Sequence, residues 1–419
     1  MYYKLLPHQE TVIEYAIKNP YSILSVACGG GKTLIAIDLQ KRLNKKMLVI
    51  CPSYLVSNWK SEILKFRGDE VVGTYIKSSK DLYDLWDTDI CVVSYDIVQK
   101  SKLIEWADIV VLDEAQVIKT MEAKVTDFIH REVFENSKKR VHLLTGTPIK
   151  NRVKEFYSLI ALCNYNPSLT LSPFLNKFED CITFADYFSN RREYDIPIKN
   201  RFVKIVSWDG YKNLEELKSY LKDIYIRVEA EEFLTIDKPL KKLVTVDDRD
   251  DKELLKAFEY FETNNSVSSD VKAKAALLKV PATYKYVKEL LEETDKVVVY
   301  TDHVEACRAL ADKLKVIPIT GSTPNSDRKR LGDEFQYGES RIIVATIGSF
   351  STGINLTASC NMVFNDVCWV PGDIEQAEYR IVRVGQNRPC VIHYIVASPQ
   401  DIKILNTLDK KRSVIEVVV

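Results

Sequence analysis

The sequence has few histidines, no paired cysteines and no excess of charge of either sign. Its 419 residues include five His and nine Cys, and no two Cys form a CxxC pair. This pattern argues against a structural zinc site and is typical of reduced thiols in a cytosolic protein. Lys plus Arg and Asp plus Glu both number 59, so the net charge is zero. Composition therefore neither indicates nor excludes a nucleic-acid partner.

Long apolar runs and targeting features are also missing. No run approaches the roughly 20 apolar residues that a membrane helix needs, and Met1-Tyr2-Tyr3-Lys4 does not resemble the start of a signal peptide. The sequence contains no repeat and no low-complexity segment. We expect a soluble, intracellular monomer without a membrane partner, cytoplasmic in a bacterial or phage-infected cell or nuclear in a eukaryote. The sequence identifies no protein partner.

Short apolar runs alternate with amphipathic helical patterns in two regions of the chain. This alternation is typical of α/β proteins with parallel sheets. We therefore predict one parallel-sheet lobe over residues 1–165 and a second over 281–419. Helical patterns such as Lys32–Leu43 and Leu55–Phe66 separate the runs of the first lobe. The predicted strands are Tyr21–Val26, Met47–Cys51, Ile90–Val93, Ile109–Leu112 and Val141–Leu144, then Val297–Tyr300, Val316–Ile319, Ile342–Ala345, Met362–Asn365 and Val391–Val396.

Residues 166–280 break this alternation and are rich in charged and aromatic side chains. We expect a mostly helical insertion with a connector to the second lobe. Asn264 to Ser269 is predicted as a flexible loop. At the other end of the second lobe, Val417–Val419 is expected to form a last edge strand or a frayed tail.

A glycine-rich loop stands between a predicted strand and a predicted helix. Gly29, Gly30 and Gly31 precede Lys32 and Thr33, in the context that a phosphate-binding loop requires. Glycines let backbone N–H groups face phosphates, and the helix N-terminus adds its positive dipole end. Lys32 would reach the β- and γ-phosphates of ATP, and Thr33 would hold Mg²⁺. The usual pattern places a glycine six residues before the lysine, and this chain has Val26 at that position.

Two acidic residues end the fourth predicted strand of the first lobe. Asp113 and Glu114 follow the apolar run Ile109–Leu112, and the carboxyl end of a strand is where parallel α/β sheets present functional groups. We expect Asp113 to bind Mg²⁺ and Glu114 to orient and deprotonate the attacking water.

Eight further segments follow one another in a fixed order along the chain. They are Leu6–Gln9, Cys51–Ser53 with Asn58-Trp59, Ser94–Asp96, Leu144–Pro148, Gly321–Pro324, Ser351–Leu356, Trp369–Gly372 and Gln376–Gln386. Together with the two motifs above, they resemble the Swi/Snf-related ATPases of helicase superfamily two. The resemblance extends over nearly the whole chain and is nearest to the annealing-helicase branch. It implies two tandem RecA-like lobes, and Lys, Ile, Asn and Tyr usage favours a phage source.

The resemblance also implies roles for individual residues. Gln9 would read the adenine base, and Gly353 would lie at the nucleotide. Gln376, Arg380 and Arg383 would contribute to catalysis from one face of a helix, at spacings i, i+4 and i+7, with the two arginines acting as arginine fingers. Val382 stands where relatives usually carry His. The expected contacts to the DNA backbone are Ser53, Asn58, Gly321, Ser322 and Thr352.

The resulting hypothesis is a DNA-dependent ATPase, with ATP and Mg²⁺, that translocates on double-stranded or branched DNA and remodels forks or junctions. One alternative is a strand-separating DNA or RNA helicase. Another is a remodeller of chromatin or of protein–DNA complexes. An ATP-inactive scaffold that only binds nucleic acid is disfavoured by the intact Lys32, Glu114, Arg380 and Arg383.

Overall fold

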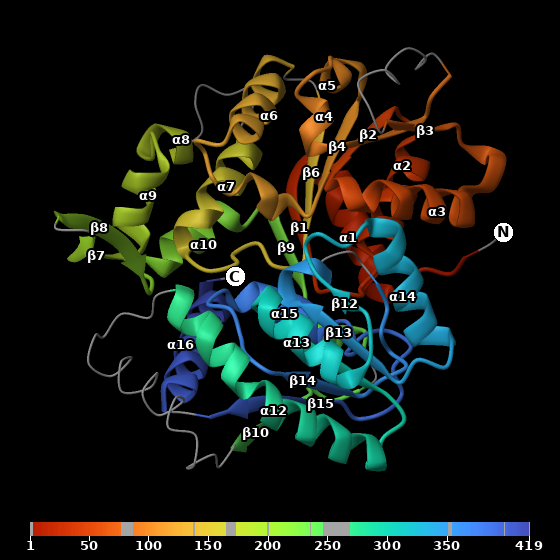
Figure 1. The fold of residues 1–419 in the computed structure, drawn as a ribbon. Helices are drawn as coiled ribbons and strands as arrows, with labels where there is room; N and C mark the ends of the chain where they lie inside the picture. Colours follow the sequence, from red (N-terminus) through yellow and green to blue (C-terminus); the bar gives the residue numbers. More distant parts are fainter. Residues whose placement is uncertain are drawn as a thin grey trace. The chain divides into compact units, whose positions relative to one another are not determined.

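The computed structural model describes the chain except residues 1–2, 77–86, 137–138, 165–172, 199–200, 235, 246–268, 351–353, 398 and 419. The fold divides into two compact units. The first contains Met1–Phe233 and Lys411–Val419, and the second contains Leu234–Lys410. Each unit is built around one parallel sheet (Figure 1). This confirms the predicted α/β class with two parallel-sheet lobes.

The first sheet has seven strands in the order β3-β4-β2-β5-β6-β1-β9, and every neighbouring pair is parallel. The predicted runs match β1 and β2 residue for residue, and they match β4, β5 and β6 to within a residue at each end. The strands are β1 (Tyr21–Val26), β2 (Met47–Cys51), β3 (Gly73–Ile76), β4 (Ile90–Ser94), β5 (Ile109–Asp113), β6 (Arg140–Thr145) and β9 (Tyr225–Val228).

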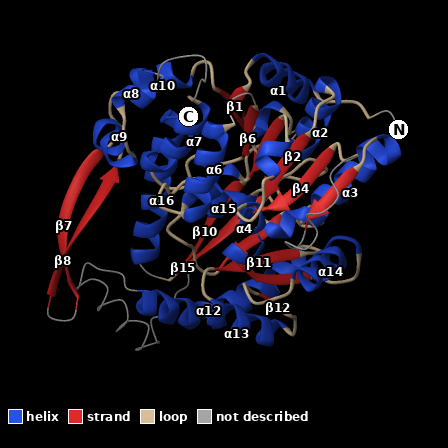
Figure 2. Ribbon diagram, turned by 90° about the horizontal axis from the view of Figure 1, so that it is seen from above, coloured by secondary structure: helices blue, strands red, loops and turns tan. Residues whose placement is uncertain are grey.

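Helices cover both faces of this sheet. Neighbouring strand residues point to opposite faces, so Ile23 of β1 packs in one core and Leu24 in the other. Figure 2 shows α2 and α3 on one side of the strands and α6 and α7 on the other. The helices are α1 (Pro7–Lys18), α2 (Lys32–Leu43), α3 (Val56–Arg67), α4 (Tyr95–Val98), α5 (Leu103–Trp106), α6 (Lys124–Glu135) and α7 (Tyr157–Cys163).

The segment predicted as mostly helical contains strands as well. A long antiparallel hairpin of β7 (Asn190–Ile198) and β8 (Arg201–Asp209) extends outward from the first unit (Figure 2). Helices α8 (Pro173–Lys177), α9 (Cys181–Phe188) and α10 (Leu214–Leu221) pack aromatic rings beside it. The aromatic residues that we noted in the sequence form this cluster, which includes the buried side chains of Phe174, Phe178, Phe184 and Phe188.

The second sheet has six parallel strands in the order β10-β15-β14-β11-β13-β12. Its central strands are buried, with one core on each face. The strands are β10 (Leu240–Thr245), β11 (Val297–Thr301), β12 (Pro318–Ile319), β13 (Ile342–Thr346), β14 (Asn361–Phe364) and β15 (Val391–Val396), and the helices are α12 (Ser269–Glu293), α13 (Val304–Leu314), α14 (Asn325–Tyr337), α15 (Pro371–Glu378) and α16 (Pro399–Val418).

Two expectations at the ends of this region have different outcomes. The expected strand or frayed tail at the C-terminus is wrong, because α16 continues to Val418, whose side chain is buried in the core of the first unit. The loop predicted from Asn264 lies outside the described residues, except for Ser269, which begins α12. Among the described helices, none is long and apolar enough to cross a membrane.

Candidate nucleotide-binding site

The predicted phosphate-binding loop, the acidic pair and the segment after β6 lie at one edge of the first sheet. Strands β5, β6 and β1 are adjacent and parallel, so their carboxyl ends meet there. The glycine loop follows β1, Asp113 is the last residue of β5, and Gly146 follows β6. A carbon atom added to Gly146 would lie 3.3 Å from the Nζ atom of Lys32, so the segment after β6 lies beside this lysine. Three stretches far apart in the sequence therefore form one site.

Each of the three loop positions requires glycine for a separate steric reason. Gly29 and Gly31 have φ angles of 89° and 81°, in the left-handed region that side chains disfavour. A Cβ on Gly31 would lie 2.3 Å from Nε2 of Gln9, and one on Gly30 would lie 2.5 Å from Cγ1 of Val26. Val26, which replaces the usual first glycine, is thus accommodated because its neighbour across the turn has no side chain.

The start of α1 holds this loop from one side. His8 Nε2 lies 2.8 Å from the Gly30 carbonyl oxygen, and Gln9 Nε2 donates to the same oxygen at 3.1 Å. The His8 ring stacks on Phe233 with ring centroids 4.7 Å apart. Gln9 therefore lies beside the glycine loop, and its reading of the base remains a prediction. His8 had no assigned role in the sequence, where a lone His beside a Gln carries no distinct signal.

Lys32 and Thr33 open α2 directly after the loop, as predicted. The Lys32 ammonium donates to the Val26 carbonyl oxygen at 3.1 Å, which folds the side chain back over the loop. Its positive charge also acts to lower the pKa of Asp113. The lysine and the carboxylate are therefore close enough to influence one another electrostatically.

Asp113 is a buried carboxylate held by two N–H donors. The Trp59 indole Nε1 donates to one carboxylate oxygen at 2.8 Å, and the Glu114 backbone N–H donates to the other at 3.0 Å. Burial, together with the neighbouring charge of Glu114, raises the pKa of Asp113 to about 6. The sequence predicts Trp59 as a core residue. Trp59 is fully buried, but its link to Asp113 could not be seen from residues 54 positions apart.

A chain of hydrogen bonds joins Glu114 to the segment after β6. The Gln116 amide donates to the Glu114 carboxylate, and its oxygen accepts a hydrogen bond from the Thr145 hydroxyl at 2.7 Å. The Thr145 hydroxyl in turn accepts the Thr147 backbone N–H at 3.1 Å. Glu114 itself has a left-handed backbone, with φ 53°, and such strain is concentrated at functional sites. The predicted catalytic base is thus oriented by a buried relay.

The residues present fit a hard divalent cation such as Mg²⁺. Mg²⁺ prefers oxygen ligands, and Thr33 and Asp113 supply a hydroxyl and a carboxylate at this edge of the sheet. The raised pKa of Asp113 shows that its buried charge is incompletely compensated by the surrounding protein groups. A cation beside it would complete that compensation.

The predicted catalytic residues of the second unit are not on one helix face. Helix α15 ends at Glu378, so it contains Gln376 but neither Arg380 nor Arg383. Beyond the helix, the Arg380 carbonyl accepts the Leu356 N–H at 3.0 Å, and Gly385 turns the chain with φ 99°. The i, i+4, i+7 argument is therefore wrong.

Both arginines instead lie in a turn after α15. The Arg380 side chain is 8% exposed, and within the described part of the chain its Nε has no hydrogen-bond partner. Val382, where relatives usually have His, is buried in the core of this unit. Val382 thus fills an apolar position between the two arginines in the sequence.

The predicted DNA contacts fall into two described groups. Ser53 and Asn58 are both exposed, the first in a short 3₁₀ turn after β2 and the second in α3. In the second unit, Gly321 and Ser322 are exposed in the turn after β12. Tyr95 is buried, and its hydroxyl donates to the Asp113 backbone oxygen at 3.1 Å. Thr352 and Gly353 lie outside the described residues.

Arg328 was not predicted as a site residue, yet its side chain holds the turn that contains Gly321 and Ser322. This buried side chain of α14 donates to the backbone oxygens of Thr320, Gly321 and Thr323 at 2.7–3.1 Å. A further bond at 3.0 Å reaches the Ser349 carbonyl after β13. Arg328 thereby fixes the exposed turn to the neighbouring strand connection. An arginine in a helix start gives no sequence signal for such a role.

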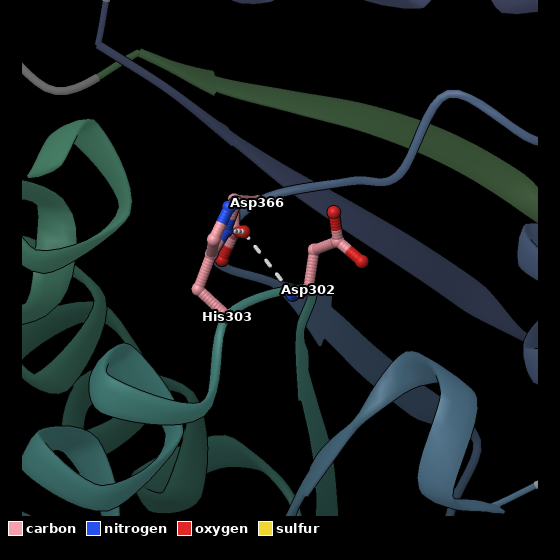
Figure 3. Close-up of side chains that lie close together, drawn as sticks. All are labelled: Asp302, His303 and Asp366. Carbon is pink, nitrogen blue, oxygen red and sulfur yellow. Dashed lines mark hydrogen bonds and ion pairs between the residues drawn. The ribbon is translucent and has the colours of Figure 1, made fainter. Parts of the chain in front are cut away.

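Asp302, His303 and Asp366 form a second cluster of ionisable side chains, in the second unit. In Figure 3 the His303 ring lies against the Asp366 carboxylate, at 2.8 Å, whereas the Asp302 carboxylate points away from the pair. Asp366 also accepts bonds from Thr301, Asn365 and the Asp302 backbone N–H. These donors keep its pKa low although burial acts to raise it. Because protein donors occupy both of its oxygens, we assign the cluster to structure: it joins the ends of β11 and β14.

The chain is similar to known families and proteins over most of its length. The SNF2-related domain family matches residues 8–247, and the helicase conserved C-terminal domain family matches residues 282–385. The chain is 27% identical over 431 residues to the DNA annealing helicase and endonuclease ZRANB3 of Bos taurus, a match that covers 94% of this chain and 38% of that protein. It is 25% identical over 443 residues to the SWI/SNF-related matrix-associated actin-dependent regulator of chromatin subfamily A-like protein 1 of Drosophila melanogaster, covering 98% of this chain and 55% of that protein.

Among solved structures, the Sulfolobus solfataricus SWI2/SNF2 ATPase core in complex with dsDNA aligns with a TM-score of 0.43 at 22% identity, covering 100% of this chain and 93% of that chain. The match to the bovine ZRANB3 covers 38% of that protein, so this chain spans well under half of its length. The SNF2-related match covers more than half of this chain, and the helicase C-terminal match follows it in the second unit. The chain belongs to the SNF2-related family of helicase superfamily two.

Proposed function

We propose that this chain is an ATP-driven translocase on double-stranded DNA that remodels forks or junctions. The observation that carries the proposal is the assembly of Lys32, Asp113 and Glu114 at one sheet edge, with a buried relay from Glu114 to the segment after β6. ATP hydrolysis mainly requires positioned charge around the phosphates and an oriented water, and these residues supply both.

Each residue of the first unit has a defined task in this proposal. Backbone N–H groups of the glycine loop and the Lys32 ammonium bind the phosphates. Thr33 and Asp113 would hold Mg²⁺, which neutralises phosphate charge when bound. Glu114, oriented by Gln116, accepts a proton from the attacking water. Gln9, next to the loop at Gly31, contacts the base.

The arginines of the second unit complete the catalytic set. Arg380 and Arg383 are proposed to reach the terminal phosphate, where an arginine finger contributes roughly 10³–10⁵ in rate. Hydrolysis then requires residues from both units. Each cycle of ATP binding and product release would move one unit relative to the other. That dependence is what converts chemistry into movement along DNA.

Double-stranded DNA is proposed as the track because the name of one relative is that of a DNA annealing helicase. The exposed Ser53, Asn58, Gly321 and Ser322 are the proposed backbone contacts. Contacts of this kind predict binding that is independent of base sequence and weakened by salt. The relative's endonuclease activity is not part of the proposal, because the match covers 38% of that protein. A phage source and a monomeric state stay predictions from the sequence.

The decisive experiment compares ATP hydrolysis with single-stranded, duplex, forked and four-way DNA and with RNA. We expect the strongest stimulation by duplex and branched DNA, and none in the Lys32→Ala variant. Absence of stimulation by any duplex or branched DNA would overturn the proposal. A requirement for a single-stranded loading tail, or stimulation by RNA alone, would identify a strand-separating helicase instead.

A further inference from the structure

The peptide between Gly30 and Gly31 needs support from outside the glycine loop. Gly29 and Gly31 have left-handed φ angles of 89° and 81°, and a peptide among glycines rotates at little steric cost because no Cβ resists the movement. The peptide is planar and trans, so the Gly31 N–H points away from the Gly30 carbonyl. The direction of that carbonyl therefore decides where one of the N–H groups that we assign to phosphate binding points.

Two side chains at the start of α1 hold this carbonyl. His8 Nε2 lies 2.8 Å from the Gly30 oxygen, and Gln9 Nε2 donates to the same oxygen at 3.1 Å. A carbonyl oxygen can only accept, so the His8 Nε2 atom carries the proton of this bond. The Gly30 carbonyl is thus turned toward α1, and the Gly31 N–H is turned away from that helix.

Phe233 supports both the His8 ring and the peptide. Its ring stacks on His8 with centroids 4.7 Å apart and planes inclined by 30°. A carbon atom added to Gly30 would lie 3.0 Å from Cε1 of Phe233, so the same ring packs against the Gly30 backbone. His8 is 6% exposed, and Gly30 is buried. An imidazole that moved away would therefore lose its stacking partner together with its hydrogen bond.

The chain reaches this position through β9. Val228, the last residue of β9, accepts the Ala27 N–H at 3.0 Å, at the start of the glycine loop. One 3₁₀ turn, Ala230–Glu232, follows. The Phe233 N–H donates to the first carbonyl of that turn at 3.2 Å. The segment after β9 is therefore attached to the beginning of the glycine loop and places an aromatic ring at its middle.

We propose that His8 and Phe233 are positioning residues that hold the Gly30–Gly31 peptide in the orientation that phosphate binding requires. The proposal rests on the proposed function, which assigns the glycine loop to the phosphates of ATP. Backbone N–H groups in such a loop bind phosphate only when they face it. Neither ring touches the nucleotide, and both act through the peptide that they hold. The expected defect is weaker nucleotide binding, with the chemical step unchanged once ATP is bound.

Phe66 provides a matched control for a role of Phe233 in packing alone. Both rings are partly buried and pack against the same apolar core of the first unit. Phe66 packs edge-on against Tyr3, with centroids 5.1 Å apart, whereas Phe233 stacks on His8. Removal of either ring therefore takes an aromatic contact from the same core, and only removal of Phe233 takes the support from the loop.

The test compares Phe233→Leu with Phe66→Leu in the full chain by steady-state ATP hydrolysis. Leu keeps an apolar side chain in the core and removes the flat ring. For Phe233→Leu we expect the KM for ATP to rise about threefold to tenfold, the effect of losing one buried hydrogen bond, while kcat changes less than about twofold. Phe66→Leu should leave KM and kcat within about twofold of the wild type.

Inorganic pyrophosphate separates the phosphate contacts from those to the base. Its Ki as a competitor of ATP should rise in Phe233→Leu by about the same factor as the KM. His8→Phe keeps a ring but removes the N–H donor, and it serves as the test should Phe233→Leu fail to fold. It should raise the KM and the Ki about twofold to fivefold, because Gln9 still donates to the same oxygen. Combining the two substitutions should add little, since both remove one support.

The outcomes separate the two proposals. A wild-type protein that does not hydrolyse ATP overturns both. Wild-type hydrolysis that no duplex or branched DNA stimulates overturns the proposed translocase but not this inference, because the KM comparison can be made without DNA. An unchanged KM in Phe233→Leu and His8→Phe overturns only the inference. Equal rises of KM in Phe233→Leu and Phe66→Leu would overturn it too, since they would assign the Phe233 ring to general stability.

Discussion

Replacing Asp113 with Asn is expected to stabilise the first unit at pH 7.5 while it abolishes hydrolysis. The Asp113 carboxyl is 5% exposed, and burial with the adjacent Glu114 raises its pKa to about 6 from 3.8. A pKa that is higher in the folded state favours the protonated form there. Its contribution to stability is therefore full below about pH 4 and is lost as the pH rises through about 6. The difference between a pKa of about 6 and one of 3.8 corresponds to roughly 3 kcal/mol of destabilisation at neutral pH.

The substitution also removes one favourable contact, which reduces the gain. Both Asp113 oxygens accept N–H groups, from the Trp59 indole and from the Glu114 backbone. Asn has only one acceptor, so its amide N–H₂ group meets one of these donors. The lost hydrogen bond costs about 1–2 kcal/mol. The net gain is then about 1–2 kcal/mol, or roughly 2–8 °C in Tm for a unit of this size.

Thermal unfolding without nucleotide or divalent metal, from pH 4 to pH 8, measures this difference. The advantage of Asp113→Asn should be largest near pH 7.5. At pH 4 the variant should instead be the less stable protein, because the folded wild-type carboxyl is then protonated and only the cost of the lost hydrogen bond remains. Asp96→Asn, at an exposed site after β4 of the same sheet, is the matched control for loss of one carboxylate. An Asp113→Asn variant that is no more stable than the wild type at pH 7.5, with a difference independent of pH, would refute the reasoning.

Three further substitutions test other parts of the site. Gly31→Ala should raise the KM for ATP about tenfold or more and displace Gln9, because a Cβ would lie 2.3 Å from its Nε2; Gly68→Ala, also at positive φ but with no atom near the added carbon, should leave the KM for ATP unchanged. Gln116→Leu should lower kcat about 10- to 100-fold with nucleotide affinity retained, since Glu114 loses its orienting amide, and a retained kcat would contradict the relay. Arg328→Lys should weaken duplex binding about threefold to tenfold with unchanged ATP affinity, because one ammonium cannot replace donors to four carbonyls; filter binding or anisotropy measures it.

Local patterns determined the elements whose cause is local. Strands β1, β2 and β15 have the predicted bounds because continuous apolar runs between turns have few alternatives to a buried parallel strand. The glycine loop and Lys32–Leu43 were predicted for the same reason: glycine conformation and helix periodicity are properties of adjacent residues. The site residues at the carboxyl ends of β1 and β5 followed from the parallel topology.

Tertiary contacts decided what adjacent residues do not encode. The strand Tyr225–Val228 is defined by its pairing with the edge of β1, and a four-residue segment has too little periodicity to predict its state. Helix α15 ends before Arg380, and the backbone that follows it is bonded to the distant Leu356 N–H and turned by Gly385. The Trp59–Asp113, Gln116–Thr145 and Gln386–Ser359 bonds are likewise choices of the fold. Directional bonds between buried polar groups depend on which surfaces the folded chain brings together. The sequence alone therefore predicted which groups would be catalytic, and tertiary structure specified which residues hold those groups in place.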